Sequence, residues 1–134
     1  MLSEAAATTA GIGLITIVTI EFGGTFLLRI VRGQVPMTDF QKAFARAGHA
    51  HAGVLVTLGL VCAVLADATA LEGLPGWLAR AGVLVSAALI SAGFFFSSMG
   101  REVTRPNKWI ALLWAGAALL AASVLTLGVG LIAA

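Results

Sequence analysis

Four long apolar stretches occupy most of this chain and leave only short segments between them. A helix that crosses the hydrocarbon core of a bilayer needs about 20 mostly apolar residues, and each stretch is long enough. Only 10% of the residues are charged and the mean hydropathy is +1.03, whereas soluble domains carry about 25% charged residues. The sequence therefore predicts an all-α fold, a polytopic four-helix transmembrane bundle that forms one domain over residues 1–134. The predicted helices cover about residues 8–31, 39–66, 77–99 and 107–131.

Turn and capping residues mark the ends of these helices. Gly33 and Pro36 follow the first stretch, and proline stops a helix while glycine permits a turn. Thr38 and Gln41 have the spacing of a capping box, which begins a helix. The Leu-Pro-Gly segment at 74–76 predicts the turn before the third helix.

The basic residues gather at one side of the predicted bundle. All Lys and Arg residues except Arg80 lie in the first and third loops or their flanks: Arg29, Arg32, Lys42, Arg46, Arg101, Arg105 and Lys108. The positive-inside rule assigns this side to the cytoplasm. We therefore expect a multi-pass protein of the plasma membrane with both termini extracytoplasmic. Because these charges mark topology, the expected partner is the lipid bilayer and not nucleic acid.

Glu21 lies near the middle of the first apolar stretch, after a run without charge from Ala10 to Ile20. A charged side chain at this depth costs at least a few kcal/mol when it faces lipid, and ionisable residues inside membranes are functional candidates by default. Glu21 must therefore face protein, water or a ligand. We interpret it as a proton or substrate site, with Thr25 one turn away on the same face. The alternative is a neutral structural carboxyl that hydrogen-bonds a neighbouring group.

Two histidines lie where the second helix enters the membrane. His49 and His51 are two residues apart, so about 200° separates them around a helix and an undistorted helix does not aim both at one metal ion. We expect His49 near the headgroups, beside Arg46, and His51 pointing into the bundle. A line from Glu21 through Thr25 to His51 would form a short proton path toward the cytoplasmic side. The alternatives are structural hydrogen-bonding histidines, or ligands to a metal or haem, since imidazole both titrates near neutrality and ligates metals.

A basic rim is expected at the cytoplasmic mouth of this path. It consists of Arg29, Arg46, His49, Arg101 and Arg105. The rim could hold an anionic substrate group, or it could serve anchoring and contacts with lipid phosphates.

Small residues form a stripe along the third predicted helix, at Gly82, Ser86, Gly93 and Ser97. Such residues let membrane helices approach closely. The stripe predicts either packing within the four-helix bundle or association between copies. From the abundance of small residues we expect a homo-oligomer or a place in a larger membrane complex.

Short segments resemble three membrane-protein families. The segment from Glu21 to Arg29, with Gly33 after it, resembles the first helix of small multidrug resistance transporters, which implies a membrane-embedded glutamate that exchanges protons for cationic drugs. The size and the outside termini are similar to the trimeric membrane-associated eicosanoid and glutathione enzymes, but Ala50 and Gly53 stand where their pattern has Asn and Glu. The His49-Ala50-His51 segment resembles the His-x-His of haem-copper oxidase helices. Each likeness covers little of the chain, and none identifies it.

The sequence leaves three functional hypotheses open. The leading one is a small proton-linked carrier or channel with a membrane-embedded carboxylate. The second is a metal- or haem-binding redox or accessory subunit that uses His49 or His51. The third is a purely structural subunit of a larger membrane complex. No serine or cysteine lies in a recognisable motif beside a base, so nucleophilic catalysis has no support.

Overall fold

The computed structural model describes all 134 residues. Its helices are α1 (Glu4–Val31), α2 (Asp39–Leu65), α3 (Gly73–Trp77), α4 (Val83–Ser97) and α5 (Ile110–Ala133). A 3-10 turn, Ala66–Ala68, follows α2, and a π-helical segment, Leu78–Gly82, joins α3 to α4. Four helical segments are long and apolar enough to cross a membrane: α1, α2 with its 3-10 turn, the continuous helix from α3 to α4, and α5. The predicted all-α fold with four apolar helices in a packed bundle is confirmed.

Two helices begin earlier than expected, each for a local reason. The predicted start of the first helix was near residue 8, but α1 begins at Glu4 because Ser3 caps it: the Ala6 N–H donates to the Ser3 hydroxyl at 3.1 Å. The segment at 74–76 is not a turn but part of α3, which begins at Gly73. Pro75 is compatible with a first helical turn, because the N–H groups there have no partner within the helix.

The connection between α4 and α5 is longer than predicted. The third helix ends at Ser97, and the fourth begins at Ile110 instead of near residue 107. Asn107 organises this loop: its N–H donates to the Ser97 carbonyl at 2.9 Å, and its side-chain amide donates to the Phe96 carbonyl at 3.0 Å. The Asn107 side-chain carbonyl accepts the Trp109 N–H at 2.9 Å, so a turn and not a helix occupies these positions.

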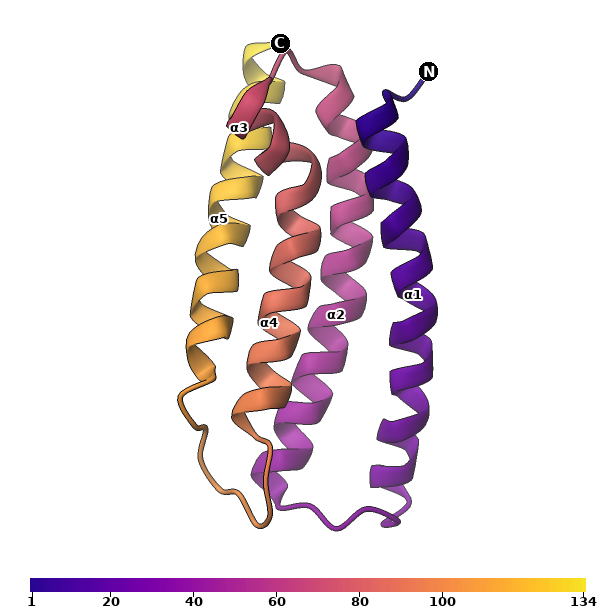
Figure 1. The fold of residues 1–134 in the computed structure, drawn as a ribbon, viewed down its shortest axis with the longest axis vertical. Helices are drawn as coiled ribbons and strands as arrows, with labels where there is room; N and C mark the ends of the chain where they lie inside the picture. Colours follow the sequence, from indigo (N-terminus) through magenta and orange to yellow (C-terminus); the bar gives the residue numbers. More distant parts are fainter.

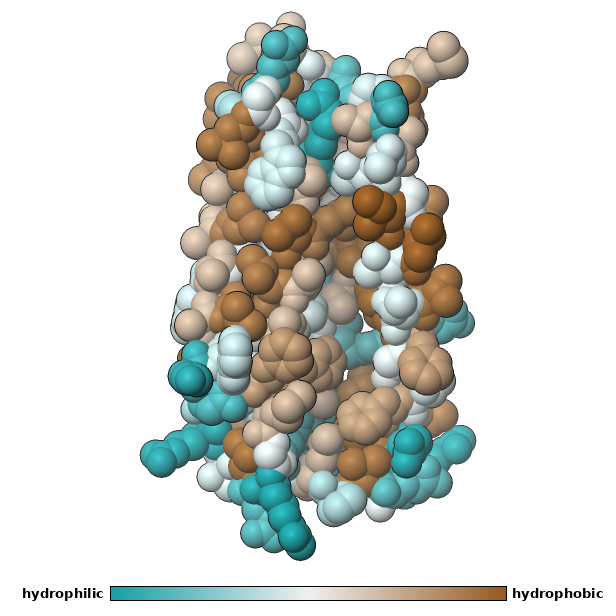
Figure 2. Space-filling view, viewed as in Figure 1, coloured by the Kyte–Doolittle hydropathy of each residue, from teal (hydrophilic) through white to brown (hydrophobic).

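The four long helices form an open array (Figure 1). α2 packs between α1 and α4, and α4 packs between α2 and α5, whereas α1 and α5 do not pack along each other. α1 is therefore held along one side only, and its buried residues are just Ala6, Gly13 and Ile30. On the face shown in Figure 2, hydrophobic side chains cover most of the middle and hydrophilic ones gather mainly at the two ends, as expected for helices that contact a lipid bilayer.

The predicted stripe of small residues lies inside the array. Gly82, Ser86, Gly93 and Ser97 are all buried. A Cβ atom on Gly93 would lie 2.5 Å from the backbone nitrogen of Leu113, so only glycine permits this approach between α4 and α5. The stripe thus serves packing within the chain, and homo-oligomerisation stays a prediction.

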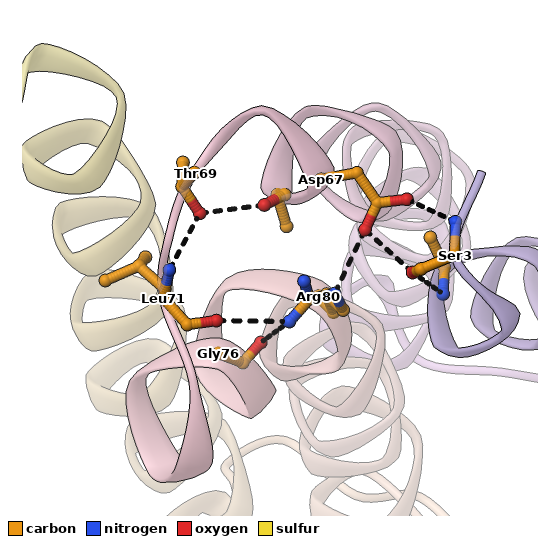
Figure 3. Close-up of polar contacts among 8 residues, drawn as sticks. Ser3, Asp67, Thr69, Leu71, Gly76 and Arg80 are labelled. Carbon is orange, nitrogen blue, oxygen red and sulfur yellow. Dashed lines mark hydrogen bonds and ion pairs between the residues drawn. The ribbon is translucent and has the colours of Figure 1, made fainter. Parts of the chain in front are cut away.

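A polar network ties three segments together at the end of the molecule that holds both termini (Figure 3). The backbone N–H and the hydroxyl of Ser3 donate to Asp67 at 2.7 and 2.8 Å. The Arg80 Nε donates to the same carboxylate at 3.3 Å, and its Nη1 donates to the carbonyls of Leu71 and Gly76 at 3.4 Å each. This network fixes the start of α1 to the end of α2 and to the π-helical segment.

Candidate functional site

Glu21 lies on the exposed surface of α1, in the middle third of the helix. It takes part in neither of the two ion pairs of the structure, and no hydrogen bond reaches its side chain. Thr25, one turn further along, is also exposed, and its hydroxyl donates to the Phe22 carbonyl of the same helix at 2.7 Å. The array alone therefore does not cover the Glu21 carboxyl, which inside a membrane would need water, a ligand or another protein surface.

His49 lies at the contact between α2 and α1, where it is half-buried. Its ring rests on the glycine pair Gly23 and Gly24. A Cβ atom on Gly24 would be 3.5 Å from Cε1 and 3.6 Å from Nε2, and one on Gly23 would be 3.7 Å from Nδ1. The Nε2 edge of the ring therefore lies over Gly24.

This position puts the His49 ring at a level of α1 close to that of Glu21. Gly24 is three residues from Glu21, and positions three apart are neighbours on a helix surface. With a rise of about 1.5 Å per residue, Glu21 and Gly24 are about 4.5 Å apart along the axis of α1. The Nε2 edge of His49, which lies over Gly24, is offset from Glu21 by about the same amount along this axis. Glu21 and His49 therefore lie at neighbouring levels of α1, with Glu21 on the exposed surface and His49 in the α1–α2 contact.

His51 lies elsewhere. It is exposed, and its ring contacts Phe94 of α4 with the ring centroids 5.0 Å apart. His51 was expected to point into the bundle, but of the two histidines it is the more exposed, and His49 is the one partly buried against α1. The physical reason is the position of α1 around α2, because residues two apart on a helix point in nearly opposite directions.

An apolar groove of about 420 Å³ lies between α1, α2 and α4, next to this contact. Its walls include Thr16 and Ile20 of α1, Ala52 and Val56 of α2, and Leu84 and Ser91 of α4. Ile20 precedes Glu21 directly, and Ala52 is one turn from His49, so the groove begins beside the Glu21–His49 region. Sequence analysis missed this groove, because it depends on how far α1 and α4 stand apart across α2.

The four arginines of the predicted basic rim lie toward the end of the molecule away from the termini, whereas His49 lies at the α1–α2 contact. Arg29, Arg46, Arg101 and Arg105 are all exposed, and none forms an ion pair. Arg101 also lines a polar cavity of about 460 Å³ with Thr38 and Gln41. The four arginines are therefore free to contact anionic groups in this region.

The metal-ligating side chains are dispersed. No group of three or more His, Cys, Asp or Glu residues is close enough to hold a metal ion. The rings of His49 and His51, both candidate ligands, face different neighbouring helices.

The fold and its surface define the class of protein. With four apolar helices long enough to span a bilayer, the chain is a small, multi-pass integral membrane protein. No protein-family model, curated protein or solved structure matches it.

Proposed function

We propose that this protein is a small proton-linked carrier or channel in which Glu21 is the proton site and His49 is its partner. The observation that carries the proposal is one of position: Glu21 is the only acidic residue in the interior of a spanning helix, and the half-buried ring of His49 lies over Gly23 and Gly24, two and three residues further along α1. Ionisable residues at such depth mark proton relays and ion pathways more often than structural positions. The depth of Glu21 and the similar level of His49 therefore favour proton transfer over a purely structural role.

The two groups suit proton transfer chemically. A carboxylate can accept a proton and a carboxyl can donate one, and imidazole is the side chain that exchanges protons most readily near neutral pH. His49 also lies nearer the basic end of the molecule than Glu21 does, since Arg46 is only three residues away. A proton that leaves Glu21 toward His49 therefore moves toward the basic end, and Thr25 provides a hydroxyl beside the same step.

The exposed side of Glu21 implies a partner in the membrane. A charged form of Glu21 facing hydrocarbon would cost at least a few kcal/mol. α1 is also the spanning helix with the smallest share of buried residues. A second copy of the chain, or a larger membrane complex, would cover this face while the carboxyl carries charge.

A flux assay on purified protein in liposomes tests the proposal. The liposomes hold a pH-sensitive dye, and valinomycin with potassium sets the membrane potential. Glu21→Gln keeps the side-chain volume and removes titration, so we expect proton flux to fall to the level of empty liposomes. Glu21→Asp should retain part of it.

Thr19→Val is the matched control. Thr19 is exposed on the same helix two residues away, and its hydroxyl bonds only its own helix, at Thr16. We expect this variant to conduct like the wild type. Unchanged flux in Glu21→Gln, with both proteins equally folded by circular dichroism, would exclude Glu21 as the proton site.

A further inference from the structure

One side of α1 carries a regular series of positions that the rest of the chain leaves uncovered. The positions alternate in steps of four and three residues: Ala7, Gly11, Leu14, Val18, Glu21, Thr25 and Leu28. None of them is buried, and a Cβ atom on Gly11 would have nothing within 4 Å. Val18 is five residues from Gly13, which packs against Leu60 of α2, so about 140° separates the two around the helix. We call these seven residues the α1 seam.

The spacing of the α1 seam is that of a helix which packs along another helix. Alternating steps of four and three residues give a period of 3.5, which keeps two helices in contact over their length with a left-handed crossing. The seam extends from Ala7 to Leu28, or about 31 Å at a rise of about 1.5 Å per residue, which matches the thickness of the hydrocarbon core. Yet α1 lies at one edge of the array and packs mainly along α2 (Figure 1), so no helix of the chain occupies the seam.

Glu21 makes a covering of lipid alone unfavourable for the seam. Its side chain is exposed and belongs to neither ion pair of the structure, and a charged carboxyl that faces lipid costs at least a few kcal/mol. The carboxyl therefore needs a polar partner at its own depth. A partner helix that follows the seam must supply this group.

A second copy of the chain meets this need by symmetry. In a parallel pair of α1 helices related by a two-fold axis, each seam residue faces its own counterpart. Glu21 then lies opposite the same residue of the other copy, and a protonated carboxyl can donate a hydrogen bond to an ionised one. Ala7 and Gly11 also meet their counterparts, and such small residues let two helices approach closely in a membrane.

We propose that the α1 seam is the interface of a parallel homodimer in which the two Glu21 carboxyls face each other. The two-fold axis runs along the membrane normal, so both copies have the same orientation in the bilayer. The dimer does not depend on the proposed proton transfer, because the carboxyls bond each other whenever one of them holds a proton.

Disulfide cross-linking in liposomes at a high lipid-to-protein ratio tests this interface. Cys62→Ala first removes the only native thiol. Leu14→Cys and Val18→Cys then place one thiol on the seam, and Ile15→Cys and Thr19→Cys place one at the next exposed position off it. A disulfide forms only where the two Cα atoms come within about 7 Å. We therefore expect a severalfold higher yield of covalent dimer from the two seam variants than from their neighbours. Equal yields at the four positions, or higher yields off the seam, would overturn the proposal.

A bulky side chain on the seam gives an independent test. Gly11→Leu should fold normally, because nothing lies within 4 Å of the added carbon, but it should hold two α1 helices apart. We expect it to lower the cross-linking of Leu14→Cys severalfold, with circular dichroism as the check on folding. Gly128→Leu is the matched control, since it adds the same side chain at an equally open position of α5, and it should leave the yield unchanged. Undiminished cross-linking in Gly11→Leu would count against the seam.

The dimer and the proton proposal fail in different experiments. Glu21→Gln should lose proton flux but keep the cross-linking of Leu14→Cys, because a side-chain amide can both donate and accept a hydrogen bond across the seam. Seam-specific cross-links in a protein without flux would overturn the proton proposal and support the dimer. Glutamate-dependent flux in a protein without seam-specific cross-links would do the opposite.

Discussion

Gln41 shows how one buried side chain can join distant parts of this protein. Its amide nitrogen donates to the carbonyls of Ser98 and Gly100 at 3.0 and 2.9 Å, and its amide oxygen accepts the Thr38 N–H at 3.2 Å. The residue is only 6% exposed. These bonds fasten the start of α2 to the loop after α4, at the basic end of the molecule.

Gln41→Ala should therefore destabilise the protein by about 1–3 kcal/mol, because it leaves buried carbonyl groups without a donor. Denaturant unfolding in detergent micelles, followed by circular dichroism, measures the loss. Lys42→Ala is the control: its exposed ion pair with Asp39 at 3.2 Å contributes little to stability. Equal losses in the two variants would show that the bonds of Gln41 are dispensable.

Local sequence patterns predicted the hydrogen bonds within the start of α2, but not the long-range hydrogen bonds of Gln41. The capping box of Thr38 and Gln41 was expected from their spacing and is confirmed. The bonds from Gln41 to the distant loop were not expected, because the partners are carbonyl groups, which every residue has. The spacing of His49 and His51 predicted that they point in opposite directions around α2. It did not predict which of them faces α1, because that depends on where α1 packs.

At the scale of helices, α4 and α5 make a close contact through glycine. Gly93 lies against the backbone of Leu113, and in the same contact a Cβ atom on Gly116 would lie 2.9 Å from the backbone nitrogen of Ile90. Two glycines on facing helices thus let the backbones approach. This contact stabilises the side of the array opposite α1.

Gly93→Ala should push α5 away from α4, since the methyl group would meet backbone atoms that cannot rotate aside. Overpacking of this kind costs about 1–3 kcal/mol, measured as a lower unfolding midpoint in detergent. Gly128→Ala is the matched control in α5, where nothing lies within 4 Å of the added carbon. It should be neutral or slightly stabilising, because alanine favours helix more than glycine does. A Gly93→Ala protein as stable as the control would contradict the close contact.

The sequence predicted the helices better than their mutual positions. Length and hydropathy were enough for the four spans, and a small-residue stripe indicated a close contact. The partner of that stripe was not predictable, because small residues pack equally well against the same chain or another copy. The π-helical segment around Arg80 has no local signal either; it coincides with the bonds of Arg80 to Leu71 and Gly76, which depend on the fold.

At the scale of the whole molecule, charge separates the two ends. Both termini lie at one end of the array (Figure 1), together with Arg80, whose charge is paired with Asp67. The remaining basic residues all lie in the two loops at the other end or in the helix ends that flank these loops. Positively charged loops remain in the cytoplasm during insertion, and the unpaired arginines of this end favour anionic lipid there.

Single cysteines can test the orientation that this asymmetry predicts. Cys62 is buried and is the only native cysteine, so Cys62→Ala provides a background without thiols. Ser3→Cys and Thr104→Cys then place one thiol at each end, both at exposed positions. In intact cells a membrane-impermeant maleimide should label Ser3→Cys and leave Thr104→Cys unlabelled until the cells are opened. The reverse pattern would place the basic end outside, and labelling of both in intact cells would mean that the chain inserts in two orientations.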